Sequence, residues 1–253
     1  MKRLNLRSLG TKTLGLIYPE NLYCMACGDT IEASTRVHGL CDECIKKTDW
    51  NIENPYADVM EDFAFDRLWT CCRYGYLPRR IMNGFKEKGR TYYAKNIGLL
   101  LTERCLQGFE EEKLEAEDFD MVLPVPMTRE KESARGYNQA ELLAKEVCRE
   151  LSIPCRRDVL IKAVETPSMR FSDGRTRRTV LAGAFSVNDH DAASGSVPEQ
   201  KPLLGKRILL VDDVSTTGST FDACARTLKE AGAENVTCLC FATVGIVQGT
   251  EGI

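Results

Sequence analysis

Residues 207–220 read RILLVDDVSTTGST, and this stretch decides the fold. Four apolar residues, 208–211, predict a short strand that is buried on both faces. Apolar residues then recur at helical spacing from Phe221 to Ala231, so a helix is expected to begin at about Thr220. The stretch therefore predicts a strand, a tight turn and a helix.

The turn carries groups that suit a ribose 5-phosphate. Backbone N–H groups at a helix N-terminus attract phosphate, Gly218 lets the backbone approach closely, and the neighbouring hydroxyls add donors. The two carboxylates repel phosphate but suit vicinal hydroxyls, or a magnesium ion with water between. The candidate binding residues are Asp212, Asp213, Ser215, Thr216, Thr217, Gly218, Ser219 and Thr220.

This arrangement resembles the signature of type I phosphoribosyltransferases, which bind phosphoribosyl pyrophosphate (PRPP). The resemblance implies that Asp212 and Asp213 hold the ribose 2′ and 3′ hydroxyls, while residues 216–220 cradle the 5-phosphate. Two other interpretations remain open. An acidic pair that ends a strand can be the metal site of another α/β protein, such as a phosphoacceptor domain, and a Thr/Gly/Ser run can be an ordinary turn. A Walker-type loop is excluded because no G-K-S/T follows the glycines.

The composition is that of an ordinary globular protein. A chain of 253 residues can form one sizeable core and a small satellite domain. A net charge of -3 gives no global attraction to nucleic acid. No apolar run approaches the roughly 20 residues of a membrane span, and the N-terminus lacks a secretory apolar region. We therefore expect a cytoplasmic protein without membrane insertion.

Four of the 12 cysteines form two C-x-x-C pairs, Cys24/Cys27 and Cys41/Cys44. Two such pairs joined by a short polar loop predict a structural zinc ion held by four thiolates. The alternative is a redox dithiol. The other eight cysteines lie in apolar or helical patterns, so we interpret them as buried thiols in a reducing cytosol. They are Cys71, Cys72, Cys105, Cys148, Cys155, Cys224, Cys238 and Cys240.

Between the cysteine pairs and the large domain, the pattern is mostly helical from Glu61 to Gly108. A short helix is also expected within residues 1–20. Residues 74–90 combine cations with aromatic side chains, which could track a phosphate backbone and stack on bases. A solvated helix face is the alternative. The cations are Arg79, Arg80, Lys86, Lys88 and Arg90, and the aromatic residues are Tyr74, Tyr76 and Phe85.

The large domain alternates strands with helices. Strands are expected at 119–126, 158–163, 184–187, 208–211 and 236–243, with a helix at 140–151. The alternation predicts a parallel sheet with its ligand outside the carboxyl ends of the strands. Residues 127–138 are expected to be a flexible basic loop that could bind pyrophosphate. The arginine-rich segment 165–183 is either a mobile cover or a disordered loop, and 189–202 is a polar loop. The expected domains are 1–50, 51–118 and 119–253.

These parts together resemble the ComF proteins of bacterial DNA uptake. The resemblance rests on the zinc module, the Y-G-Y stretch at 74–76, LPVPMTREKESARGYNQAELL at 123–143, the arginine loop and the DD-TTGST motif. It implies a type I phosphoribosyltransferase-like α/β fold, a parallel sheet with helices on both faces, preceded by a four-cysteine zinc module and a helical segment. It also implies that Arg135, Gly136 and Asn138 lie by the pyrophosphate, and that Arg177 or Arg178 reaches PRPP from the hood.

Two departures from the family bear on function. Met169 stands where the family usually has Gln, and Val180 where it has Asn, which puts transferase activity in doubt. We favour a protein that binds PRPP with Mg²⁺ and serves DNA uptake, with single-stranded DNA or a competence helicase as partner. The alternative is an active phosphoribosyltransferase that transfers phosphoribosyl to an unidentified nucleobase or amine and releases pyrophosphate. In either case no residue needs to act as an obligatory nucleophile.

Overall fold

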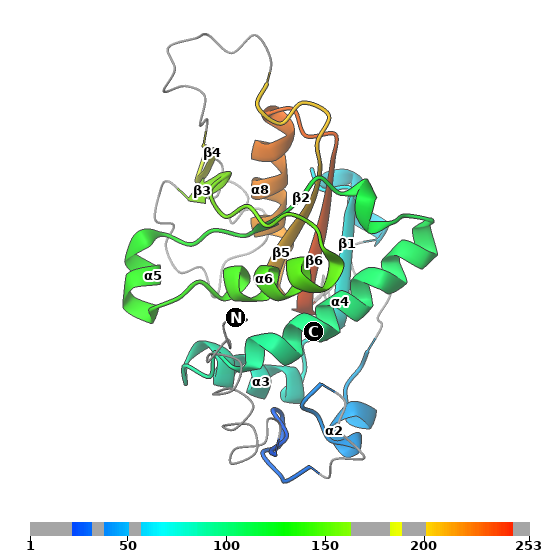
Figure 1. The fold of residues 1–253 in the computed structure, drawn as a ribbon, viewed down its shortest axis with the longest axis vertical. Helices are drawn as coiled ribbons and strands as arrows, with labels where there is room; N and C mark the ends of the chain where they lie inside the picture. Colours follow the sequence, from blue (N-terminus) through cyan, green and yellow to red (C-terminus); the bar gives the residue numbers. More distant parts are fainter. Residues whose placement is uncertain (1–21, 32–37, 51–56, 163–182, 189–200, 245–253) are drawn as a thin grey trace, which may run out of the picture.

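The computed structural model describes residues 22–31, 38–50, 57–162, 183–188 and 201–244. Within these residues, the centre is a four-stranded sheet with the order β1-β6-β5-β2, in which every neighbouring pair is parallel (Figure 1). The strands are β1 (Arg67–Arg73), β2 (Met121–Pro124), β5 (Arg207–Ser215) and β6 (Asn235–Thr243). The predicted parallel sheet is thereby confirmed for the strands predicted at 119–126, 208–211 and 236–243, whereas those predicted at 158–163 and 184–187 form a separate antiparallel pair.

The side chains of β5 alternate between two apolar cores. Leu209 and Val211 pack on the side of α4 (Tyr93–Glu112) and α6 (Gln139–Leu151). Ile208 and Leu210 pack on the side of α8 (Ser219–Glu230). Helices therefore cover both faces of the sheet, and residues 208–211 are buried on both faces as predicted.

Smaller elements surround the sheet. Helix α3 (Tyr76–Lys86) lies below the carboxyl ends of the strands in Figure 1, between the sheet and the cysteine pairs. A separate antiparallel pair joins β3 (Leu160–Lys162) to β4 (Phe185–Val187). The remaining elements are α2 (Asp42–Lys47), η2 (Ala57–Asp62), η3 (Ala116–Asp118) and α5 (Arg129–Arg135).

Strand β1 corrects the expectation that residues 61–108 are mostly helical. Its sequence RLWTCCR has five buried central residues, and it pairs along β6 as the edge strand of the sheet. In a short run of apolar residues, the spacing of the apolar positions does not distinguish a buried strand from a buried helix. The segment predicted to connect two domains thus supplies part of the sheet, while α3 and α4 confirm its helices. The three-part domain division stays a prediction.

Helix α5 corrects the expectation of a flexible loop at 127–138. Thr128 caps its first turn, where its side chain accepts a hydrogen bond from the Lys131 N–H, and Gly136 ends the helix with a φ of +84°. Apart from 201–202 and Gly183, the predicted arginine and polar loops lie outside the described residues, as does the predicted N-terminal helix. Among the described residues, no helix is both long and apolar enough to cross a membrane.

Candidate ligand and metal sites

The acidic pair stands where β5 extends beyond the end of β2. Pro124 of β2 pairs with Val211, and the next two residues of β5 are Asp212 and Asp213. Because side chains alternate along a strand, Asp212 continues the α8 side of β5 and Asp213 continues the α4/α6 side. The backbone N–H of Asp213 donates to Asp212 Oδ1 at 2.8 Å. The two carboxylates therefore diverge from one edge of the sheet.

Lys86, the last residue of α3, contacts this pair directly. Its Nζ lies 2.8 Å from both Oδ1 and Oδ2 of Asp213. The sequence left open whether Lys86 belongs to a face that tracks a phosphate backbone or to a solvated helix face, but its side chain is largely buried against Asp213. No local pattern reveals this contact, since the two residues are 127 positions apart in the sequence. The structure thus adds a cation to the candidate site.

The charges of this cluster depend on one another. Burial and the charge of Asp213 raise the pKa of Asp212 to about 7, with Lys86 partly opposing them. Burial acts to lower the pKa of Lys86, but the charges of Asp213 and Asp212 outweigh it and hold that pKa above its ordinary value. Lys86 is therefore cationic at neutral pH, and the raised pKa of Asp212 lies close to neutral pH.

The turn after β5 is held by a distant segment. Gly218 has a φ of +74° and precedes α8, which begins at Ser219, one residue before the expected start. The Phe63 ring lies so close that a Cβ on Gly218 would be 2.9 Å from it. The Ala64 N–H donates to the buried Asp222 Oδ1 at 2.8 Å. In the turn itself, Thr217 Oγ1 and Ser219 Oγ hydrogen-bond at 2.8 Å. Residues 63–64 therefore fix the start of α8.

The predicted pyrophosphate residues lie at the end of α5. Arg135 donates to Gln139 Oε1 at 2.7 Å and approaches Glu87, the residue after Lys86, at 3.9 Å. Asn138 uses its side chain on the backbone: Oδ1 accepts from the Ala140 N–H at 3.0 Å, and Nδ2 donates to the Val125 carbonyl at 3.1 Å. Asn138 thus holds the loop together. The predicted hood residues Arg177 and Arg178 lie outside the described residues.

A cleft of about 850 Å³ opens beside β2. At one end the cleft is lined by Pro124, which pairs with Val211, the residue before the acidic pair. From there it extends along α5 to β3. Lys162 lines it and acts electrostatically on Asp212. Its charged lining is mixed and consists of Arg129, Glu130, Glu132, Glu141, Arg157, Asp158 and Lys162. The cleft and the acidic pair therefore share one edge of the sheet.

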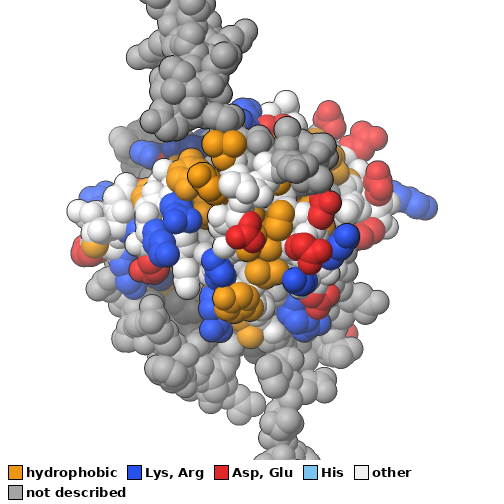
Figure 2. Space-filling view, turned by 90° about the horizontal axis from the view of Figure 1, so that it is seen from below, with side chains coloured by type: hydrophobic (Ala, Val, Ile, Leu, Met, Phe, Trp, Pro, Cys, Tyr) orange, Lys and Arg blue, Asp and Glu red, His pale blue; other side chains and the backbone are white. Residues whose placement is uncertain are grey.

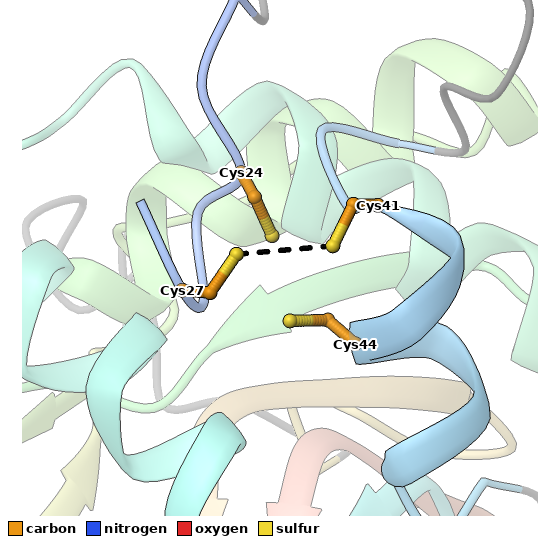
Figure 3. Close-up of side chains that lie close together, drawn as sticks. All are labelled: Cys24, Cys27, Cys41 and Cys44. Atoms are coloured by element: carbon orange, nitrogen blue, oxygen red, sulfur yellow. Dashed lines mark hydrogen bonds between the residues drawn. The ribbon is translucent and has the colours of Figure 1, made fainter. Parts of the chain in front are cut away.

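The four cysteines of the C-x-x-C pairs form one cluster, from a turn and the start of α2 (Figure 3). All four Sγ atoms lie within 4.8 Å of one another, and those of Cys27 and Cys41 are 3.8 Å apart. Four sulfurs at about 2.3 Å from a zinc ion stand about 3.8 Å from each other in a tetrahedron. The cluster therefore has the size and donors of a tetrahedral metal site.

The backbone around this cluster folds back on the sulfurs. Gly28 has a φ of +88°, and the Asp29 N–H donates to Cys27 Sγ at 3.4 Å. Burial disfavours the Cys24 thiolate, but N–H groups of neighbouring residues outweigh it and lower the pKa of Cys24 to about 7. Burial raises the pKa of Cys27 to about 11. A bound dication would draw all four groups into the thiolate form.

Of the eight other cysteines, seven are buried as predicted, and Cys155 is exposed. It follows Pro154 in the connection after α6, where it forms an isolated bridge with Val122. Connecting loops run over the protein surface, and the apolar pattern around Cys155 does not reveal that it lies in one. The expectation of a buried thiol is wrong for this residue.

The predicted stacking face of α3 is only partly present. Phe85 is 0% exposed and belongs to the core, so it cannot stack on a base. Tyr76 is 72% exposed, with the guanidinium of Arg80 at 5.8 Å from its ring, and Arg79 lies over Tyr74 at 5.7 Å. Figure 2 shows the lower end of the molecule, where basic and acidic side chains are interspersed with apolar ones.

Comparison with known proteins identifies the large domain. The phosphoribosyl transferase domain family matches residues 138–248. Competence protein F of Haemophilus influenzae is 32% identical over 117 residues, 46% of this chain and 47% of that protein. DNA utilization protein YhgH of Escherichia coli O157:H7 is 26% identical over 219 residues, 86% of this chain and 83% of that protein. Competence protein ComFC of Bacillus subtilis is 31% identical over 112 residues, 44% of this chain and 39% of that protein.

These matches differ in extent. The aligned part spans about half of competence protein F, whereas the match to YhgH runs along most of both chains. The cysteine cluster, the parallel sheet with helices on both faces, and the acidic pair with its turn agree with the resemblance drawn from the sequence. The chain is therefore similar to the ComF proteins, and its residues 138–248 match the phosphoribosyl transferase domain family.

Proposed function

We propose that this protein binds Mg²⁺–PRPP at the turn between β5 and α8 and serves DNA uptake. The observation that carries the proposal is the acidic pair near the end of β5, followed by a glycine turn that opens α8, at the carboxyl edge of a parallel sheet. Ligands of open α/β sheets bind at this edge, and the first N–H groups of a helix favour phosphate. The carboxylates would accept hydrogen bonds from the ribose hydroxyls, and Mg²⁺ would neutralise the pyrophosphate.

The role in DNA uptake is proposed from the family. Two of the relatives are competence proteins by name, and a third is a DNA utilization protein. The exposed part of α3 offers Tyr76 with Arg79 and Arg80 as a small surface for single-stranded DNA. A competence helicase as partner stays a prediction.

We assign a structural zinc ion to the four-cysteine cluster. The sulfurs have the spacing of a tetrahedral site, and all four positions would be filled by thiolates, which leaves none open for catalysis. Zinc bound there would hold residues 22–50 against α3 and α4. Their buried residues Met25 and Leu40 join the same core as those helices.

Calorimetric titration of Mg²⁺–PRPP tests the ligand. We expect saturable binding to the wild type and a loss of at least about tenfold in Asp212→Asn, because charged hydrogen bonds contribute about 1.5–3 kcal/mol. This variant keeps the Lys86–Asp213 ion pair. Glu117→Gln, an exposed change in η3, is the matched control and should bind like the wild type. Absence of binding to a folded wild type would refute the proposal.

The cleft beside β2 supports transferase activity as a second candidate function. It lies at the edge of the sheet that carries the acidic pair and offers space for a second ligand. A screen of nucleobases and amines for pyrophosphate release from bound PRPP tests it. Release that depends on both PRPP and one added compound would favour the enzyme, whereas binding without release would favour the binding protein.

Titration of a fluorescent oligodeoxythymidine tests the DNA surface. With so few cations at the surface of α3, the slope of log K against log salt should be shallow, about −0.7 for each phosphate contacted. Arg80→Gln should weaken binding, and Tyr76→Ala should weaken it further through lost stacking. Equal affinity in the wild type and both variants would remove α3 from the DNA site.

A further inference from the structure

Lys86 places a fixed positive charge inside the acidic cluster. Both contacts to Asp213 are 2.8 Å, and that carboxylate is largely shielded from water. A cation so close to a partly buried carboxylate strongly opposes a second cation at the same oxygens, since screening by water is weak there. The position beside Asp213 is therefore already taken by an ammonium group.

The backbone that carries Lys86 is firmly held. Ile81, Met82 and Phe85 of α3 are buried in the core, and the Tyr137 hydroxyl donates to the Phe85 carbonyl. Tyr137 itself belongs to the turn between α5 and α6. The ammonium group thus reaches Asp213 from an anchored helix end, next to the predicted pyrophosphate residue Arg135.

We propose that Lys86 is a positioning residue that acts as the counter-ion of the acidic pair. It keeps a bare divalent cation away from Asp213 and leaves Asp212 to accept a hydroxyl hydrogen bond. A metal ion then enters the site only with the phosphates of the ligand. The inference rests on the proposed function for the identity of the ligand, but the exclusion of a free metal ion is independent of it.

Titration with Mn²⁺ alone tests the exclusion, with the cysteine cluster kept loaded with zinc and free Mn²⁺ followed by electron paramagnetic resonance. We expect Lys86→Met to bind Mn²⁺ at least about tenfold more tightly than the wild type, because one opposing charge is removed. Lys86→Met/Asp213→Asn should lose this gain. Lys88→Met, which removes an exposed lysine two residues away, should match the wild type.

Equal Mn²⁺ affinity in the wild type and Lys86→Met would overturn the inference. Lys86→Arg keeps the charge and should restore exclusion, which a purely structural role of the side chain does not predict. This metal titration separates the two proposals. A wild type that fails to bind PRPP refutes the proposed function and leaves the metal result standing, and the reverse result refutes only the role of Lys86.

A measurement on the wild type avoids dependence on variants that fold poorly. The side-chain ¹⁵N signal of Lys86 in lysine-labelled protein should be protected from exchange by its buried ion pair. It should stay unchanged on addition of millimolar Mg²⁺ and should move on addition of Mg²⁺–PRPP. A shift with Mg²⁺ alone would contradict the inference.

Discussion

Helix α3 contacts two clusters of acidic side chains, four thiols and two carboxyl groups, whose negative charge is balanced in different ways. The sulfur atoms of four cysteines lie within 4.8 Å of one another. The two carboxyl groups lie near the end of β5, where Lys86 of α3 forms an ion pair with Asp213. The thiol cluster has the geometry of a site for an external dication. The acidic pair carries a cation that belongs to the chain itself.

From this difference we expect the cysteine cluster to need a metal ion to fold and the acidic pair to fold without its ligand. The segment that carries the cysteines is small, and we expect its folding to depend on the zinc ion that we propose. The acidic pair is built on a buried strand of a complete sheet, and its internal counter-ion reduces the cost of leaving two carboxylates together. Four predictions test this contrast, in order of decreasing effect.

Removal of zinc should have the largest effect. Metal binding supplies on the order of 10 kcal/mol of folding free energy in small four-ligand modules, so Cys24→Ser should unfold residues 22–50 and leave the sheet intact. Zinc content and limited proteolysis measure this. Cys155→Ser, which changes an exposed cysteine outside the cluster, should keep one zinc ion per chain. Full zinc content in Cys24→Ser would contradict the prediction.

The two glycine turns should respond differently to alanine. Gly28 and Gly218 both have positive φ, but an added Cβ meets nothing within 4 Å at Gly28 and meets the Phe63 ring at 2.9 Å at Gly218. Gly28→Ala should cost about 1 kcal/mol of backbone strain, and Gly218→Ala roughly 3 kcal/mol, since Phe63 must also shift. Urea unfolding of the zinc-loaded variants gives both values. Equal losses would show that Phe63 yields freely.

Stability should depend on pH through Asp212. Its pKa of about 7 in the folded protein lies above the value of about 4 in an unfolded chain. The protonated form is therefore favoured by folding, and this contribution is lost as the pH rises from about 4 through about 7. Asp212→Asn should remove this slope and raise the free energy of unfolding at pH 8 by about 1 kcal/mol.

Urea unfolding at pH 5 and pH 8 measures this effect, with Glu117→Gln as the exposed control that should keep the wild-type slope. An Asp212→Asn variant that is less stable than the wild type at pH 8 would contradict this prediction. It would show that favourable contacts of the Asp212 carboxylate outweigh its burial and the repulsion from Asp213.

Arg80→Gln should have the smallest effect. Arg80 donates to the Cys27 carbonyl at 2.9 Å from an exposed position on α3. Its loss should speed the release of zinc to a chelator by at most roughly fivefold, because exposed charged contacts are weak. Arg79, on the same helix, contacts Tyr74 and not the cysteine segment. The control variant Arg79→Gln should therefore release zinc at the wild-type rate. Identical rates in both variants would show that Arg80 does not support the cluster.

The parts of the molecule that sequence reasoning predicted well are those with local causes. The strand, turn and helix at 207–230 were predicted from the spacing of apolar residues, the acidic pair and a glycine within one stretch. The helix begins one residue before its expected start. The cysteine cluster follows from spacing alone. In both cases the relevant groups come from one short stretch of the sequence.

The parts that were missed depend on distant partners. The Lys86–Asp213 contact and the packing of Phe63 on Gly218 join segments more than a hundred residues apart, and a single sequence has no period that reports them. Strand β1 was missed because its short run of five buried residues does not distinguish a strand from a helix. Helix α5 was missed because its basic residues were interpreted as those of a phosphate-binding loop, although Thr128 is a helix-capping residue.

Helix α3 has one further consequence, because it touches both clusters. Arg80 holds the backbone of Cys27, and Lys86, about 9 Å further along the helix, holds Asp213. Any ligand that draws Lys86 away from Asp213 acts on the same rigid element that supports the cysteines. Thermodynamic linkage then requires reciprocity: if such a ligand changes the affinity of the cysteine cluster for its metal, the metal must change the affinity for the ligand by the same factor.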